Sequence, residues 1–179
     1  MPDVFTKAKR SQVMSRIRGR GNRDTELALR GLFRRQEIAG WRRHASLKFK
    51  VQGSKFKVRG LSAGVFRVKP DFVFPKLKVA VFVDGCFWHG CSKHATKPRK
   101  NAAFWRRKLA GNKARDRLVT RSLRRAGWRV LRIWEHELAG KRQERLVRRI
   151  RRFLAERGAR PKFVWLKNQN LPTSGRTAG

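Results

Sequence analysis

The residues best suited to chemistry lie in one short run after an apolar stretch: Asp84-Gly85-Cys86-Phe87-Trp88-His89-Gly90-Cys91-Ser92-Lys93-His94. Cys86, Cys91 and His94 form a Cys-x4-Cys-x2-His pattern, and zinc takes tetrahedral sulfur and nitrogen ligands. A fourth ligand should therefore come from elsewhere. His136 is the best candidate because it follows another apolar segment, whereas His44 is distant in sequence and has a weak claim. The alternative is that the cysteines are small buried residues and the histidines lie on the surface.

Two acidic residues flank adjacent apolar segments. Asp71 precedes one segment and Asp84 ends the next, so their carboxylates would converge at one sheet edge if the segments pair as strands. Carboxylates hold Mg²⁺, which polarises a phosphodiester and activates water. His89 is a candidate general base because imidazole titrates near neutral pH. The alternative is that both acids are ordinary turn residues.

Aromatic and polar side chains accompany this loop. Phe87 and Trp88 lie within it, and Trp105 begins the next expected helix. They either pack into the core or insert between DNA bases as apolar wedges. The same helix carries three polar residues whose side chains face the site or form ordinary surface hydrogen bonds: Asn112, Arg115 and Asp116.

The charge of the chain indicates a polyanionic partner. Its 179 residues include 48 Lys and Arg against 11 Asp and Glu, a net charge of +37, and its 40% hydrophobic residues allow a folded core. Clustered cations attract nucleic acid and release counterions from its phosphates. No apolar stretch is long enough to span a bilayer and the start lacks a signal-peptide core, so we expect a cytosolic protein with no membrane partner.

Periodicity predicts an α/β domain over residues 24–166, between a basic N-terminal arm (1–23) and a flexible tail (167–179). A short helix around Met14 is expected in the arm. A helix capped by Asp24 and Thr25 should reach about residue 36, with Glu26 in its first turn.

Strands and further helices complete the predicted domain. Alternation over 41–68 predicts short strands, including a hairpin of 48–51 with 55–58. The remaining elements are expected as buried strands at 70–74, 78–83 and 128–134 and helices at 101–126 and 141–157.

Three runs carry a resemblance to a known family: Pro70-Asp71-Phe72-Val73-Phe74, Val83-Asp84-Gly85-Cys86-Phe87-Trp88-His89-Gly90-Cys91, and Gly127-Trp128-Arg129-Val130-Leu131 with Trp134-Glu135-His136. From the arm to about Leu138 the chain resembles the very short patch repair (Vsr) DNA mismatch endonucleases. The resemblance implies a restriction-endonuclease-like α/β core, with a mixed central sheet flanked by helices and one structural zinc site. It also implies magnesium-dependent nicking of duplex DNA 5′ of the thymine in T:G mismatches, which arise by deamination of 5-methylcytosine.

The resemblance also implies roles for single residues. Asp71 would bind magnesium, His89 would be the base and Glu26 an accessory acid, with Asp84 a further catalytic candidate. The implied zinc ligands are Cys86, Cys91, His94 and His136. The resemblance matches Phe87, Trp88 and Trp105 to an aromatic wedge that enters DNA, and Asn112 and Asp116 to polar helix positions near the site. All five are candidate DNA contacts, as are Met14 and Arg115.

Three features depart from the family pattern. A restriction-type motif would place Lys two residues after Asp84, where Cys86 stands, so His89 would replace that Lys. Some family members carry His at the position of Asp84, which leaves its role open. The segment from Lys48 to Arg67 is longer and more basic than the usual connection, and its function is not indicated.

The expected substrate is double-stranded DNA with a T:G mismatch, cut by a monomer in a bacterial-type cytoplasm beside the nucleoid, with mismatch-repair proteins as partners. Manganese could replace magnesium. One alternative is a related sequence-specific homing or anti-invader endonuclease. The other is a non-catalytic, zinc-stabilised nucleic-acid-binding protein.

Overall fold

The computed structural model describes residues 22–50, 65–96, 98 and 100–156, and the isolated residues 6, 8 and 12. Several expectations lie outside these residues: most of the basic arm with Met14, the strand at 55–58 and the tail from 167. Within the described part of the chain, no helix is both long and apolar enough to cross a membrane.

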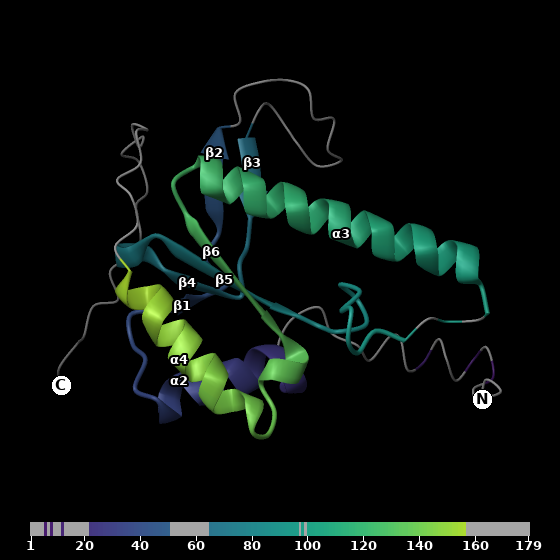
Figure 1. Cartoon of the computed structure of the whole chain (residues 1–179). Helices are drawn as coiled ribbons and strands as arrows, with labels where there is room; N and C mark the ends of the chain where they lie inside the picture. Colours follow the sequence, from purple (N-terminus) through teal and green to yellow (C-terminus); the bar gives the residue numbers. More distant parts are fainter. Residues whose placement is uncertain are drawn as a thin grey trace, which may run out of the picture.

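A mixed four-stranded sheet lies at the centre of the molecule (Figure 1). Its order is β1 (Arg42–Arg43), β4 (Phe72–Phe74), β5 (Val79–Asp84) and β6 (Arg129–Trp134). The first two pairs are antiparallel, whereas β5 and β6 are parallel. Parallel neighbours need a crossover, and α3 (Ala102–Arg125) supplies it. The predicted α/β class with a mixed, helix-flanked sheet is confirmed.

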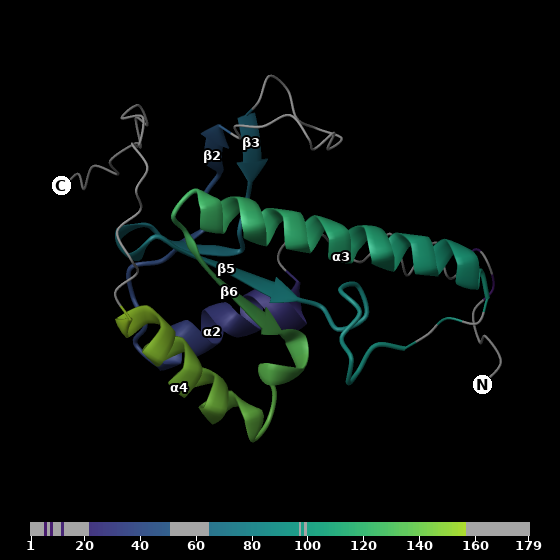
Figure 2. The ribbon, with the colours of Figure 1, turned by 45° about the horizontal axis from the view of Figure 1, so that its top comes forward.

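Helices cover both faces of this sheet (Figures 1 and 2). On one face, α2 (Ala28–Arg35) and α4 (Arg142–Ala155) form a core cluster with Val79 and Val81 of β5. On the other face, Leu123 of α3 packs in a second cluster with Ala80. Because successive strand residues point to opposite faces, β5 is buried on both, as its continuous apolar run predicted.

The first helix begins differently from our prediction. A π-helical turn, η1 (Arg23–Leu27), leads into α2, and the side chain of Asn22 accepts a hydrogen bond of 2.9 Å from the backbone N–H of Asp24. Asn22 is therefore the N-cap, and the prediction that Asp24 and Thr25 cap the helix was wrong. An Asn two residues before Asp24 can satisfy a free N–H group of the first turn in the same way.

A separate two-stranded sheet precedes β4. The predicted strand at 48–51 is present as β2 (Leu47–Lys50), but it pairs antiparallel with β3 (Val65–Val68), so that Lys48 lies opposite Arg67. The hairpin thus spans a longer connection than the tight turn that we expected. Two short 3-10 helices, η2 (Pro75–Leu77) and η3 (Glu135–Glu137), complete the described elements.

Candidate active site and metal centre

The functional residues meet at one edge of the sheet. Since β5 and β6 are parallel, with Asp84 opposite Trp134, their carboxyl ends lie side by side. The loop with the Cys-Phe-Trp-His run follows β5, and η3 with His136 follows β6. Asp71 immediately precedes β4, which begins at this edge because it runs antiparallel to β5. The topology therefore gathers segments that are far apart in sequence.

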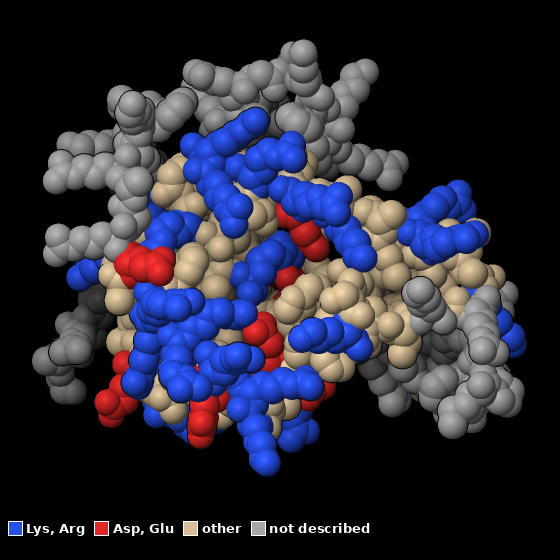
Figure 3. All heavy atoms as spheres, viewed as in Figure 1, with Lys and Arg blue, Asp and Glu red and all other residues tan. Residues whose placement is uncertain are grey.

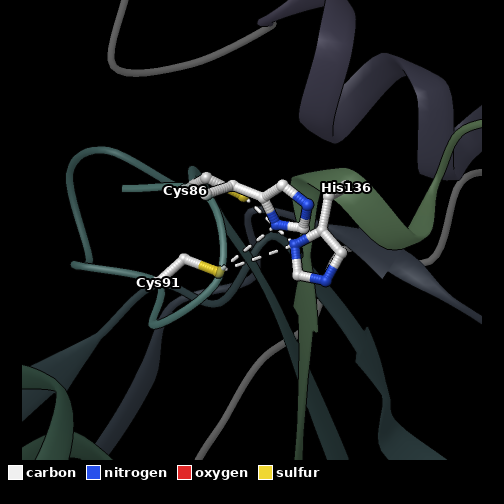
Figure 4. Close-up of side chains that lie close together, drawn as sticks. Cys86, Cys91 and His136 are labelled. Atoms are coloured by element: carbon white, nitrogen blue, oxygen red, sulfur yellow. Dashed lines mark hydrogen bonds between the residues drawn. The ribbon is translucent and has the colours of Figure 1, made fainter. Parts of the chain in front are cut away.

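Two cysteines and two histidines form a compact cluster: the ligand atoms of Cys86, Cys91, His94 and His136 all lie within 4.8 Å of one another. The Sγ atoms of Cys86 and Cys91 lie 3.2 and 3.7 Å from Nδ1 of His136, and Cys91 Sγ lies 3.8 Å from Nδ1 of His94. Figure 4 shows Cys86, Cys91 and His136 pointing toward one another from the loop and from η3.

These separations fit a tetrahedral metal. Zn–S bonds of about 2.3 Å and Zn–N bonds of about 2.0 Å at tetrahedral angles place ligand atoms about 3.3 to 3.8 Å apart. Burial, and then the neighbouring His94, lower the pKa of His136 and favour the neutral ring that binds metals. Burial raises the pKa of the Cys86 thiol, so a bound cation would be needed to hold it as thiolate. The donor set therefore suits zinc.

The cluster is supported by a residue that the sequence analysis missed. Glu135 accepts a hydrogen bond of 2.9 Å from the backbone N–H of Cys86 through Oε2. The loop also closes on itself, since the N–H of Cys91 donates to the carbonyl of Cys86 at 2.9 Å. Glu135 stands directly before His136. An acidic residue next to a candidate metal ligand, in so basic a chain, was the sequence signal that could have identified it.

A second cluster contains His89, Asp84 and Asp116, whose ligand atoms also lie within 4.8 Å of one another. Nδ1 of His89 is 2.6 Å from Oδ2 of Asp116 and 3.6 Å from Oδ1 of Asp84. Arg132 of β6 joins both acids: its Nε donates to Asp84 Oδ2 at 2.6 Å, and its Nη2 lies 2.9 Å from Asp116 Oδ1. In sequence, Arg132 is one of many basic residues and carries no signal of its own.

Charge sets the protonation of this cluster. Burial lowers the pKa of His89, but the hydrogen bond to Asp116 and the charges of Asp84 and Asp116 outweigh it, so the net pKa lies above its ordinary value. Burial raises the pKa of Asp116, yet the contacts with His89 and Arg132 prevail and lower it. Asp116 therefore favours the protonated form of His89 when that form arises, and His89 favours the ionised form of Asp116.

Asp71 and Glu26 form an acidic neighbourhood beside this cluster. Asp71 accepts a 2.8 Å hydrogen bond from the N–H of Val83, and burial followed by the charges of Glu26 and Asp84 raises its pKa, despite that bond. Glu26 is 3% exposed and contacts the side chains of Arg43 and His44. His44, which had a weak claim as a zinc ligand, lies here instead. Its backbone N–H donates a hydrogen bond of 3.2 Å to the backbone carbonyl of Asp71.

The convergence of Asp71 and Asp84 is therefore partial. The strands pair as expected and both acids lie at the same edge, close enough for Asp84 to raise the pKa of Asp71. Asp84, however, is 3% exposed and engaged by Arg132. Among the described residues, the ligand atoms grouped with Asp84 come from His89 and Asp116 and not from Asp71.

The aromatic residues form a group between the loop and α3. The ring centroid of Phe87 lies 5.1 Å from those of Trp88 and Trp105, and Phe104 stacks edge-on against Trp105 at 5.4 Å. Phe104 is 53% exposed, whereas the other three rings are partly buried. The rings thus stand at the surface beside the site rather than in either core cluster.

Polar residues of α3 attach the helix to the loop. The side-chain amide of Asn112 donates to the carbonyl of Trp88 at 2.9 Å, and Asp116 holds His89 as described. The shared face expected for these two residues therefore looks toward the loop. Arg115 is exposed on α3, and Met14 lies outside the described residues.

Comparison with known proteins adds to this geometry. Residues 46–95 match the family of the DNA mismatch endonuclease Vsr. The chain is 34% identical over 158 residues to the Type II nicking enzyme V.NmeAIP of Neisseria meningitidis serogroup A, a match of 84% of this chain and 98% of that enzyme. It is 32% identical over 163 residues to the DNA mismatch endonuclease Vsr of Escherichia coli K12, which spans 89% of this chain and 92% of the relative.

Another relative matches a shorter part of the chain at higher identity. The chain is 59% identical over 71 residues to the Type II nicking enzyme V.NaeI of Lentzea aerocolonigenes, which amounts to 40% of this chain and 43% of that enzyme. This match thus covers less than half of V.NaeI.

Taken with the acidic, histidine-bearing edge of the sheet, these relatives define a DNA endonuclease, a hydrolase that cuts phosphodiester bonds. Such enzymes depend on metal ions, and the described residues offer two groups of candidate ligands. The similarity to V.NmeAIP and to the Escherichia coli enzyme extends over most of each chain. The chain belongs to the Vsr family of DNA mismatch endonucleases.

Proposed function

We propose that this endonuclease nicks duplex DNA 5′ of the thymine in T:G mismatches by magnesium-dependent hydrolysis, and so initiates very short patch repair. The observation that carries the proposal is the pairing of His89 with Asp116 at 2.6 Å, at the sheet edge that also carries Asp71. A histidine held by a carboxylate beside a partly buried acid is the combination expected for hydrolysis by an activated water.

His89 would act as the general base. Because Nδ1 of the ring is engaged by Asp116, Nε2 is the nitrogen left to take a proton from the attacking water. Asp116 would stabilise the imidazolium that forms, as a carboxylate does behind a catalytic histidine. Asp84 would act through this unit, since it faces both His89 and Arg132.

Asp71 would hold the catalytic magnesium. Its partly buried carboxyl has a raised pKa and lies beside the acids Glu26 and Asp84, so a divalent cation would relieve their mutual repulsion. Magnesium supplies polarisation of the phosphate and activation of water. Glu26 would be the accessory acid, positioned by Arg43 and His44. Manganese offers the same oxygen-ligand chemistry and is the natural substitute in assays.

The four-residue cluster would hold structural zinc through Cys86, Cys91, His94 and His136. Two of these residues are buried and the cluster ties the loop after β5 to η3 after β6. A loop with little core of its own gains stability from such a crosslink. Zinc here would fix His89, which lies between the two cysteine ligands.

The aromatic group of Phe87, Trp88 and Trp105 would enter the DNA beside the mismatch, since apolar wedges unstack and kink a duplex. Asn112 would position Trp88 through its carbonyl. Met14 and Arg115 remain proposed DNA contacts. The finer organisation is also a proposal: one endonuclease domain over 24–166, a monomer acting beside the nucleoid in a bacterial cytoplasm, and mismatch-repair proteins as partners.

A nicking assay tests the proposal. The purified protein is given end-labelled duplexes that differ in a single T:G or C:G pair, with and without Mg²⁺. Nicking of the T:G duplex that disappears in Asp71→Asn supports it. Asp24→Asn removes an exposed acid of the first helical turn and should cut normally, which makes it the matched control.

A second candidate function is sequence-directed nicking without a mismatch. It is favoured by the relatives from Neisseria meningitidis and Lentzea aerocolonigenes, whose names describe Type II nicking enzymes. Equal cutting of T:G and C:G duplexes would replace the repair function by this one. The alternative of a non-catalytic, zinc-stabilised nucleic-acid-binding protein is not supported, because the chain belongs to a family of endonucleases.

A further inference from the structure

A basic groove runs along the C-terminal half of α3 beside β6, separate from the aromatic group. It is open to solvent and has a volume of about 620 Å³. Figure 3 shows Lys and Arg side chains over the end of α3 nearest β6, and others over α4. The residues that line it are Asp116, Arg117, Thr120, Arg121, Arg124, Arg125 and Arg132.

The groove has an excess of uncompensated positive charge. Arg132 is neutralised by Asp84 and Asp116, and Asp116 is the single acid among the lining residues. Within the described part of the chain, no ion pair involves Arg117, Arg121, Arg124 or Arg125, and all four are exposed. Like charges this close on a helix repel one another, so an anionic ligand would stabilise them.

The spacing of these arginines matches a polyanion rather than a single ion. Arg117, Arg121 and Arg124 stand at i, i+4 and i+7, on one face of α3. At about 1.5 Å of rise per residue, they extend over about 10 Å. One strand of duplex DNA carries a phosphate about every 3.4 Å of its axis, so this row would run beside about three phosphates.

The groove also leads to the proposed catalytic group. Its Asp116 holds Nδ1 of His89 at 2.6 Å, and its Arg132 holds Asp84. A strand that lies in the groove is therefore directed toward the side chain that would activate water. We propose that the groove along α3 binds the sugar-phosphate backbone of one DNA strand and aligns it with His89. The alignment with His89 rests on the proposed function, whereas the binding of the DNA backbone in the groove does not.

The salt dependence of DNA binding tests this inference. The variant Arg117→Gln/Arg121→Gln/Arg124→Gln is compared with Arg34→Gln/Arg145→Gln/Arg148→Gln, which removes three exposed arginines from α2 and α4 on the opposite face of the sheet. Both variants lose the same charge, so a general field effect acts on them equally. Fluorescence anisotropy with a labelled, fully matched duplex, without added magnesium, gives the affinity at several salt concentrations.

Three lost phosphate contacts should lower the slope of log K against log[salt] by about 2.7. Between 50 and 200 mM salt, the affinity of the unmodified protein should thus fall about 40-fold more than that of the α3 variant. The α2/α4 variant should keep most of the original slope. Equal slopes for the two variants would overturn the proposal.

A measurement on the unmodified protein guards against misfolding of the variants. Phenylglyoxal modifies accessible arginines, and peptide mass spectrometry reports each position with and without the same duplex. DNA should protect Arg117, Arg121 and Arg124 but leave Arg34 and Arg148 reactive. Protection of neither group, or of both alike, would remove the groove as the binding site. Because the duplex is matched and uncut, failure of T:G nicking would overturn the proposed function and leave this result standing.

Discussion

Replacing Arg132 by leucine tests how much the ion pair between Arg132 and Asp84, beside the proposed active site, stabilises the fold. The guanidinium donates to Asp84 through both Nε and Nη2, at 2.6 and 2.5 Å. The side chain of Asp84 is 4% exposed and that of Arg132 is 23% exposed. Arg132→Leu therefore leaves a buried carboxylate without its main partner.

The magnitude follows from this burial. Removing one partner of a buried ion pair costs about 3 to 5 kcal/mol, whereas an exposed pair contributes about 0.2 to 1 kcal/mol. We expect about 3 kcal/mol, at the lower end of the buried range, because Arg132 is partly solvated and His89 lies 3.6 Å from the same carboxylate. With a urea m-value of about 2 kcal/mol per M, the unfolding midpoint falls by about 1.5 M.

A double-mutant cycle in urea separates the pair from its surroundings. Asp84→Val removes the acid with a side chain suited to a strand, and the double variant Asp84→Val/Arg132→Leu should be destabilised by less than Arg132→Leu alone. The control is Glu156→Gln, which removes the partner of Arg129 at a side chain that is 59% exposed, and should cost under about 1 kcal/mol.

The free energies of unfolding of these variants show whether Arg132 compensates the buried carboxylate of Asp84. A loss below about 1 kcal/mol for Arg132→Leu would show that water, and not Arg132, compensates Asp84. A double variant less stable than both single variants combined would likewise contradict the reasoning, because the pair would then have no favourable coupling.

Three further outcomes are expected. Because the pKa of His89 is raised, its protonation stabilises the fold fully below the ordinary pKa of about 6.5, and this stabilisation is lost as the pH rises through the folded pKa. Because the pKa of Asp116 is lowered, its ionisation stabilises the fold above about pH 4. Thermal melts of Asp116→Asn should therefore show a larger deficit at pH 5.5 than at pH 9, and an equal deficit would contradict the pairing. Chelation of zinc should lower the melting temperature, whereas omission of Mg²⁺ should stop cleavage alone; an unchanged melt of metal-stripped protein argues against structural zinc. Leu123→Ala, at a fully buried position of α3, should cost about 2 to 5 kcal/mol in urea unfolding, and a loss under 1 kcal/mol would show that α3 is not anchored there.

Local patterns predicted the regular elements well. The 3.6-residue periodicity of α4 and the continuous apolar run of β5 both depend on neighbours in sequence, so they could be read directly. The partner of β2 could not, because Lys55–Val58 repeats its pattern and pairing preference alone does not distinguish that repeat from β3. The N-cap moved to Asn22 for a similar reason, since several adjacent residues can accept the same hydrogen bond.

The candidate site divides in the same way. Residue type and spacing singled out Cys86, Cys91 and His94, because they lie within one loop and carry side chains suited to a metal. His136 could be added because it follows the next buried strand. Arg132 and Arg43 were missed, since in a chain with 48 basic residues no single arginine stands out before its partner is known.

Positive charge, few acids and the Cys-Phe-Trp-His loop were thus enough to indicate the kind of chemistry. The pairing of each acid with its partner became visible only in the folded chain. Folding turned Asp84 toward Arg132, placed Asp116 against His89 and surrounded Glu26 with Arg43 and His44. The physical reason is that ion pairs and hydrogen bonds act over a few ångströms, and the folded chain brings residues 17 to 48 positions apart within that range.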